Sequence, residues 1–353
     1  MLAAALAAQD GLRIVLGLGG LAELGYAPSE ETLRLLAPHV PAEEMAALRL
    51  RFDANRAVVR ASRLFTTVPD SGRLIEGIAW DPAYRRLFAS SVVGRELLYT
   101  DGETWRAVPG FNPGSLFGLA IDDARRLIWV ASGAVEQTPS PETAFRGLIA
   151  LSIDDFRIVH RIATGPEGGP GDIALGADGT LYAADPARGT IWRVGVGDSV
   201  ATILVPPGRL QNPQGMVPSI DRRRLYVADY VYGLALVDTN DGAVTRLESG
   251  VTTMLDGIDG LLPWRGGLLA IQNGTSPRRI IHLTLDSSGR RITGSRVVES
   301  AHPDWGEPTL GFIRRGNLVY VADAQWERYG AGGVVTGEGP TRPTAIREAR
   351  LPR

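Results

Sequence analysis

One pattern occurs six times along the chain and constrains its fold more than any other feature. Each copy has a Gly or Asp, an apolar run, a polar turn and a second apolar run, usually Leu-Tyr/Trp-Val-Ala followed by Asp or Ser. A period of about 40–50 residues with several strands per unit is typical of a β-propeller. One such small sheet cannot bury both of its faces, whereas a closed ring of sheets can. The sequence therefore predicts an all-β, six-bladed β-propeller. The copies begin at Glu76, Gly118, Asp172, Gly215, Gly257 and Gly311.

Residues 1–63 differ from the rest, because they are rich in Ala, Leu, Glu and Arg and have helical spacing. Ser29 is suited to cap one helix and Pro41 to begin another. We therefore expect a short N-terminal α-helical appendage over residues 1–63, and the propeller over residues 64–353. Residues 1–8 resemble the end of a signal peptide, with an ordinary helix as the alternative. This favours a periplasmic or secreted protein, with a cytoplasmic one as the alternative.

Composition excludes several classes of function. The net charge is −2, so no basic excess is available for a phosphate backbone and no nucleic acid partner is expected. The absence of Cys excludes disulfides, a thiolate nucleophile and Cys-ligated zinc. No window is apolar for about 18 residues, so no membrane span is expected. Gly17–Gly20 imitates a dinucleotide-binding loop, but Pro28 and Pro41 interrupt the βαβ unit that this loop requires.

The residue before each first apolar run is the most informative for function. In a propeller the innermost strand of every blade lines the central channel, so these positions converge on one mouth of it. Carboxylate and amide oxygens from separate blades suit Ca²⁺ or Mg²⁺. Hydrated charges, or hydrogen bonds between blades, are the alternative. The positions are Glu76, Phe117, Gly171, Gln214, Asp256 and Leu310, with Asp172 beside Gly171 and Asp259 close after Asp256.

Five segments carry a resemblance to a known family. They are Glu76-Gly77-Ile78-Ala79-Trp80-Asp81-Pro82, Gly171-Asp172-Ile173, Pro213-Gln214-Gly215, Leu225-Tyr226-Val227-Ala228-Asp229 and Leu255-Asp256-Gly257. In these segments the chain resembles the SMP-30/gluconolactonase/LRE-like superfamily and, more distantly, paraoxonases and strictosidine-synthase-like proteins. The resemblance implies a divalent cation at the channel mouth, usually calcium, that polarises a lactone or ester carbonyl or activates water.

The resemblance also implies a ligand set, which this chain matches in part. The family uses a Glu, two Asn and an Asp. The Glu corresponds to Glu76 and the Asp to Asp256, whereas Gly171 and Gln214 stand at the two Asn positions. With Asp172 beside Gly171, the expected metal ligands are Glu76, Asp172, Gln214 and Asp256.

Further candidates lie in loops that precede or follow inner strands. His302 lies in a long loop with Trp305 and Glu307, where a His beside carboxylates can act as a general base near pH 7. A loop His that only contacts backbone is the alternative. The expected catalytic residues are His302, Glu307 and Asp259, and the expected substrate-binding residues are Trp305, Gln272 and Asn273. The Asp that recurs as Asp185, Asp229 and Asp323 is expected to make a structural bond once per blade.

Two functions remain open from the sequence. The first is a divalent-metal-dependent hydrolase of a small lactone or ester, acting at the channel mouth. The second is a non-catalytic propeller that binds a small ligand or a protein partner on the same face. The insert over residues 134–145 is expected to lie on the functional face. The Gly-, Pro- and Thr-rich tail after Gly330 is expected to close the last blade loosely or to fray.

Overall fold

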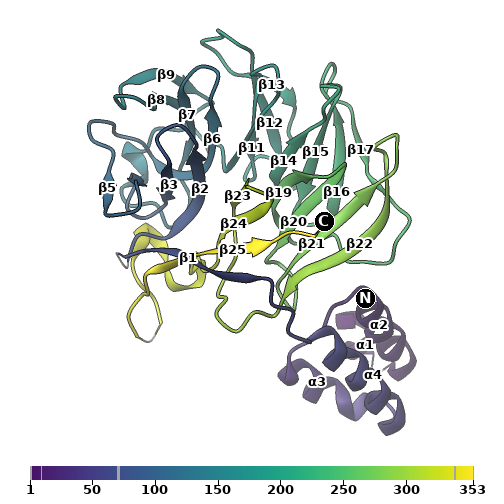
Figure 1. The fold of residues 1–353 in the computed structure, drawn as a ribbon. Coiled ribbons are helices and arrows are strands. Elements are labelled where there is room, and N and C mark those ends of the chain that lie inside the picture. The colour runs from purple at the N-terminus through teal and green to yellow at the C-terminus, as the bar shows by residue number, and fades with distance from the viewer. Residues whose placement is uncertain (1, 9, 70–71, 338, 353) are drawn as a thin grey trace.

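The chain forms a ring of small sheets with a group of helices attached to one side (Figure 1). The computed structural model describes residues 2–8, 10–69, 72–337 and 339–352. Over these residues the strands make six sheets, and the innermost strands contact one another in sequence order around a closed circle. The prediction of a six-bladed β-propeller is confirmed. The innermost strands are β2, β6, β10, β14, β19 and β23.

The first four blades are antiparallel meanders whose strands follow one another in the chain. The first consists of β2 (Ile75–Asp81), β3 (Arg86–Ser91), β4 (Leu97–Thr100) and β5 (Trp105–Ala107). The second consists of β6 (Ser115–Asp122), β7 (Leu127–Gly133), β8 (Gly147–Ser152) and β9 (Ile158–Ala163). The third consists of β10 (Asp172–Leu175), β11 (Leu181–Asp185), β12 (Thr190–Val194) and β13 (Thr202–Val205). The fourth consists of β14 (Pro213–Pro218), β15 (Arg224–Asp229), β16 (Gly233–Asp238) and β17 (Val244–Arg246).

The last two blades depart from this plan. In the fifth, the edge strand β18 pairs in parallel with β22, and the other strands form a meander. In the sixth, the outermost strand is β1, the first strand of the propeller, which pairs with the C-terminal strand β25. The fifth blade contains β18 (Glu248–Ser249), β19 (Ile258–Trp264), β20 (Gly267–Gln272), β21 (Arg279–Leu285) and β22 (Arg291–Ser300). The sixth contains β1 (Ser62–Val68), β23 (Gly311–Arg314), β24 (Asn317–Val321) and β25 (Thr344–Arg350).

Both ends of the propeller therefore meet in one blade, and this closes the ring. β25 is paired on both of its sides, so the tail is held firmly over Thr344–Arg350, contrary to the expectation of a loose closure. Buried Glu299 accepts hydrogen bonds from Ser62 N (3.1 Å) and Ser62 Oγ (2.7 Å), and Tyr320 donates to its other oxygen (2.9 Å). These bonds fasten β1 to the fifth blade and to β24.

Apolar side chains between successive blades form the core. Residues from the third and fourth blades pack together, as do residues from the fourth and fifth and from the sixth and first. Burial on both sides explains why each blade requires its neighbours, as the repeat predicted. In the second strands nearly every residue is buried, as in the all-buried stretches Leu127–Gly133 of β7 and Gly267–Gln272 of β20.

The helical appendage has its own small core. α2 (Gly11–Glu23), α3 (Glu30–Leu36) and α4 (Ala42–Asn55) pack through Ile14, Leu33 and Phe52, which are fully buried. Ser29 caps α3 as predicted, and Gly17–Gly20 lies inside α2 rather than in a loop. The remaining helices here are α1 (Leu2–Ala7) and the short 3₁₀ helix η1 (Ala37–His39).

The appendage contacts the fifth blade, where Ala27 N donates to Ser276 O at 2.7 Å. The division of the chain into a helical segment over residues 1–63 and a propeller over residues 64–353 stays a prediction. No helix among the described residues is long and apolar enough to cross a membrane.

Candidate functional site

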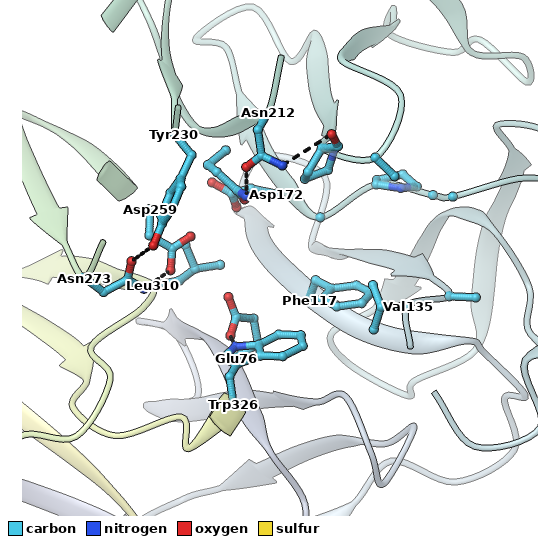
Figure 2. Close-up of a pocket in the computed structure, with 18 of the residues that line it drawn as sticks. Glu76, Phe117, Val135, Asp172, Asn212, Tyr230, Asp259, Asn273, Leu310 and Trp326 are labelled. Carbon is cyan, nitrogen blue, oxygen red and sulfur yellow. Dashed lines mark hydrogen bonds between the residues drawn. The ribbon is translucent and has the colours of Figure 1, made fainter. Parts of the chain in front are cut away.

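A pocket of about 370 Å³ lies at one mouth of the central channel, where loops and inner strands of all six blades meet (Figure 2). Of the described residues that line it, four are carboxylates and none is Lys, Arg or His. The walls also supply amide and aromatic groups. The lining residues with polar or aromatic side chains are Glu76, Phe117, Asp172, Asn212, Gln214, Tyr230, Asp259, Asn273, Glu307 and Trp326.

A β-bulge at the start of an inner strand delivers a side chain to this pocket in four of the blades. The register between the first and second strands shifts there, and a bulge turns the side chain of the extra residue toward a new direction. The residue that follows is Gly in each case. A Cβ on Gly118 would clash with Asp172 Oδ1 of the next blade, so the glycine permits neighbouring inner strands to approach closely. The bulged residues are Glu76, Phe117, Gln214 and Asp259.

The structure does not bring Asp256 to the pocket, which corrects the expected meeting of Asp256 with Glu76. Asp256 is exposed and lies in a turn before β19, against a different hollow beside Arg246. The turn Asp256-Gly257 adds residues ahead of the strand, and the bulge that faces the channel falls at Asp259 instead. Two of the other blades have a polar residue, Gly and an apolar residue at the bulge. Asp259-Gly260-Leu261 has the same motif, so the sequence did contain the information that places Asp259 at the pocket.

Hydrogen bonds hold two of the carboxylates in place. Trp326 Nε1 donates to Glu76 Oε2 at 2.7 Å, and Asn273 Nδ2 donates to Asp259 Oδ2 at 2.8 Å. Tyr230 in turn donates its hydroxyl proton to Asn273 Oδ1 at 3.0 Å. Figure 2 shows Glu76 and Trp326 on one wall and the Asp259, Asn273 and Tyr230 chain on another. Each of these carboxylates keeps oxygen lone pairs for a ligand.

The amides form a third group on the wall opposite Glu76. Gln214 Nε2 donates to Asn212 Oδ1 at 2.8 Å, and Figure 2 shows Asn212 beside Asp172. Asp172 Oδ1 accepts from Ile173 N at 2.8 Å. The structure thus brings Glu76, Asp172 and Gln214, three of the four expected metal ligands, to one pocket.

Electrostatics make the pocket unusual. Burial raises the pKa of Asp172 to about 7, and burial together with the nearby Asp172 charge raises the pKa of Asp259 to about 7. Burial and the Asp259 charge likewise raise the pKa of Glu307 to about 7. The pKa of Glu76 is raised well above its usual value, first by burial and then by Asp259. Buried like charges without a cation cannot all ionise near neutral pH.

Glu307 is the carboxylate with the greatest freedom to bind something else. Its Oε2 is buried and has no hydrogen-bond partner in the structure. Its backbone N donates to Asp323 at 3.3 Å, which fixes the loop that carries it. Buried polar atoms in proteins nearly always have a hydrogen-bond partner, so this oxygen is available to a ligand, a water molecule or an ion.

The recurring Asp residues act as predicted and support the pocket from behind. Asp229 accepts from the backbone N of both Gln211 and Asn212 at 2.9 Å. Asp185 accepts from Gly169 N at 3.3 Å, as Asp323 does from the loop before β23. The structural role expected for this residue is confirmed, because each Asp holds a loop that lines the pocket.

Three expected site residues lie elsewhere. His302 is buried with its Nε2 3.1 Å from Arg347 Nη2, and Trp305 Nε1 donates to Tyr320 OH at 2.8 Å. Both belong to the contacts that close the ring between the fifth and sixth blades, because the first part of the long loop packs against Arg347 and Tyr320, whereas Glu307 further along the same loop reaches the pocket. Gln272 is fully buried, and its Oε1 accepts from Arg279 Nε at 2.6 Å. Roles for these residues in substrate binding or catalysis stay predictions.

Sequence reasoning missed Trp326, Tyr230 and Asn212 as pocket residues. Tyr230 directly follows the recurring Asp229, and Asn212 directly precedes β14. Trp326 lies in the short 3₁₀ helix η3 (Trp326–Arg328) after β24. The sequence could have identified Tyr230 and Asn212 as pocket residues, because both stand directly beside a repeated motif. The insert over residues 134–145, which contains η2 (Pro141–Thr143), does reach the functional face, since Ala134 and Val135 line the pocket.

The donor chemistry of the pocket fits a hard divalent cation, although no ready-made cluster exists. Among the residues that the structure describes, no three His, Cys, Asp or Glu side chains lie close enough to hold a metal ion. The walls nevertheless offer four carboxylates and three amides, and none of the described lining residues is a basic side chain that could neutralise them. Oxygen donors of this kind suit Ca²⁺ or Mg²⁺ and not a soft metal.

Comparisons with known proteins agree with the fold. A family model described as strictosidine synthase-like, N-terminal, matches residues 154–194. A search of curated proteins finds no match. Similar solved structures include a gluconolactonase from Xanthomonas campestris, with a TM-score of 0.54 and 18% identity over 83% of this chain and 96% of that one.

Two further solved structures share the architecture. The PQQ-bound aldose sugar dehydrogenase from Streptomyces coelicolor has a TM-score of 0.54 and 16% identity, over 83% of this chain and 99% of that one. A luciferin-regenerating enzyme has a TM-score of 0.55 and 12% identity, over 84% and 96%. The chain thus shares the propeller fold of these solved structures, in agreement with the fold that the resemblance implied.

Proposed function

We propose that the protein hydrolyses a small lactone or ester in the pocket at the channel mouth. The observation that carries the proposal is the convergence of Glu76, Asp172, Asp259 and Glu307 in one pocket that, over the described part of the chain, contains no basic side chain. Carboxyl groups whose pKa values lie near the working pH are suited to move protons. The similarity of the fold to that of a gluconolactonase supports the same class of reaction.

Glu307 is suited to act as the general base. Its unpartnered Oε2 can accept a proton from a water molecule. Burial raises the pKa of Glu307 to about 7, which makes its carboxylate a stronger base that is still partly ionised near neutral pH. The oxygen of that water then attacks the carbonyl carbon as the proton leaves. A carboxyl group that is still protonated, such as Asp172, returns a proton to the departing alkoxide. Water and the lactone give a hydroxy acid.

Glu76 and Asp259 are suited to hold a divalent cation, with Gln214 and Asn212 as further oxygen donors. When bound, such a cation supplies a Lewis acid for a carbonyl oxygen and neutralises charge in the transition state. Trp326 and Asn273 keep the two carboxylates oriented toward the pocket. Phe117, Val135 and Leu310 cover the remaining walls with apolar surface, which limits the access of water.

The competing function is a binding module for a cationic or polar ligand. The lack of a close group of three metal-ligating side chains among the described residues favours it. Both functions predict that the acidic pocket attracts cations, so only turnover separates them.

The test compares two aspartates that stand close in sequence but differ in location. Hydrolysis of a panel of unsubstituted γ- and δ-lactones and aryl esters is followed with a pH indicator, before and after chelation and with Ca²⁺ restored. Asp259→Asn should lower kcat/KM by about 10²–10⁴-fold, as expected for loss of a positioned charge at the reacting centre. Asp256→Asn, outside the pocket, should retain wild-type activity. Equal activity of both variants, or turnover of no substrate, would reject the hydrolase in favour of the binding module.

A further inference from the structure

The central channel beyond the acidic pocket is a second cavity, of about 440 Å³, with a different chemical character. Apolar side chains make most of its wall, and Asp172 is its one charged lining residue among those that the structure describes. Representative members of the wall are Ile78, Leu119, Leu175, Met216 and Leu261.

The two cavities meet. Asp172 and Leu310 line both of them, so the acidic pocket and the apolar channel share a boundary at these two side chains. The inner strands show how the change in character arises. In three inner strands the bulged residue that lines the pocket is polar, and the residue two positions further on lines the channel and is apolar. These pairs are Glu76 and Ile78, Gln214 and Met216, and Asp259 and Leu261.

Apolar surface continues to the far mouth of this channel. Ile220 lines the channel and is 97% exposed, and Ala177 and Pro263 beside it are also exposed. Apolar cavities in proteins bind apolar molecules more readily than they hold ordered water, because water needs polar partners there. An occupant that also enters the acidic pocket must therefore be polar at one end and apolar at the other.

We propose that the substrate carries an unbranched aliphatic chain, which lies in the apolar channel while its lactone or ester group lies among the carboxylates of the pocket. This inference rests on the proposed function and specifies the class of substrate. Because the two cavities adjoin at Asp172 and Leu310, the bound molecule has its head toward Glu307 and its tail toward Ile220. Small lactones without a chain would leave the channel unused and be poorer substrates.

The test uses γ-lactones whose unbranched side chains run from methyl to decyl. Each added methylene that enters the channel should raise kcat/KM about fourfold, which corresponds to about 0.8 kcal/mol per buried methylene. The increase should stop once the chain reaches the far mouth. Isothermal titration calorimetry with the same lactones at low temperature measures binding without relying on turnover.

Two tryptophan variants in the third blade distinguish binding of the alkyl chain in the channel from non-specific hydrophobic binding at the surface. Leu175→Trp narrows the channel and should abolish the dependence on chain length while leaving the methyl compound unaffected. Ile203→Trp places the same side chain on the outer strand β13, where Ile203 is already 49% exposed, and should keep the dependence. Ala177→Trp at the exposed far mouth replaces Leu175→Trp if that variant melts early, and should shorten the longest chain that still gains affinity.

The outcomes distinguish this inference from the proposed function. Hydrolysis that is independent of chain length, or a chain-length dependence unchanged in the channel variants, overturns the inference and leaves the hydrolase standing. Binding that strengthens with chain length in the wild type but not in Leu175→Trp, with no turnover, supports the channel site and rejects the hydrolase. Neither binding nor turnover of any lactone overturns both.

Discussion

Replacing Asp259 by Asn should make the cation-free protein more stable, and increasingly so as the pH rises. Asp259 is fully ionised in the unfolded chain above its ordinary pKa of 3.8, but burial and the charge of Asp172 raise its pKa to about 7 in the folded protein. Between these values the folded state keeps a proton that the unfolded state has lost. The free energy of unfolding therefore falls with rising pH and stays low above pH 7.

The magnitude follows from the shift. A displacement from 3.8 to about 7 corresponds to a penalty on the order of 4 kcal/mol once the group is ionised in both states. Asn keeps the size of the side chain and can accept the hydrogen bond from Asn273. Asp259→Asn should thus gain roughly 1–2 kcal/mol over the wild type at pH 5 and most of the full amount at pH 8.

Urea denaturation followed by tryptophan fluorescence, in chelator and at a series of pH values, measures this difference. Asp256→Asn serves as the matched control, because its exposed side chain should give a much smaller gain. Ca²⁺ at 100 times its apparent dissociation constant at each pH stabilises the wild type by about 2.7 kcal/mol. It should therefore reverse the order of wild type and Asp259→Asn at pH 5 and narrow the difference between them at pH 8. A difference that does not grow with pH, or an Asn variant less stable at pH 8 in chelator, would refute the electrostatic reasoning.

Three further predictions concern other parts of the site and the ring. The kcat/KM of the proposed hydrolysis should rise as the pH passes through about 7, because Glu307 ionises there. Glu307→Gln should remove this rise from the pH–rate profile, and an unchanged profile would exclude Glu307 as the base. Gly118→Ala should lower the free energy of unfolding by about 1–3 kcal/mol in urea titrations, because the added Cβ would clash with Asp172 Oδ1. An unfolding free energy equal to that of the wild type would mean that the two inner strands move apart without cost. Tyr320→Phe should cost about 1–3 kcal/mol by leaving buried Glu299 short of a donor, and a loss below about 0.5 kcal/mol would show that this bond does not fasten the ring.

Local pattern alone was sufficient to predict the six blades and several details. The alternation of apolar runs and turns specifies strand pairs, and strand pairs with two apolar faces are stable only in a ring. Ser29 caps its helix because the cap depends on residues within one turn. The structural role of Asp229 was also predictable, since its bonds to Gln211 and Asn212 repeat in equivalent form in other blades.

The composition of the site was partly predictable. Glu76, Asp172, Gln214, Asp259, Asn273 and Glu307 all line the pocket, because each stands at or beside the start of an inner strand or the end of a second strand. Asp256 was expected there and is absent. Two Asp-Gly pairs stand close together, and only the pairing of β19 with β20 determines which of them becomes the bulge.

Tertiary structure alone decided where the long loops go and how the ring closes. Nothing in the sequence of β1 states that it pairs with β25 at the opposite end of the chain, because strand pairing depends on partners brought together by the whole ring. The same closure draws His302 and Trp305 toward Arg347 and Tyr320 and away from the channel. Periodicity along a chain encodes which residues face a core, whereas the direction of a loop and the choice of a distant partner depend on packing that exists only after the blades have assembled.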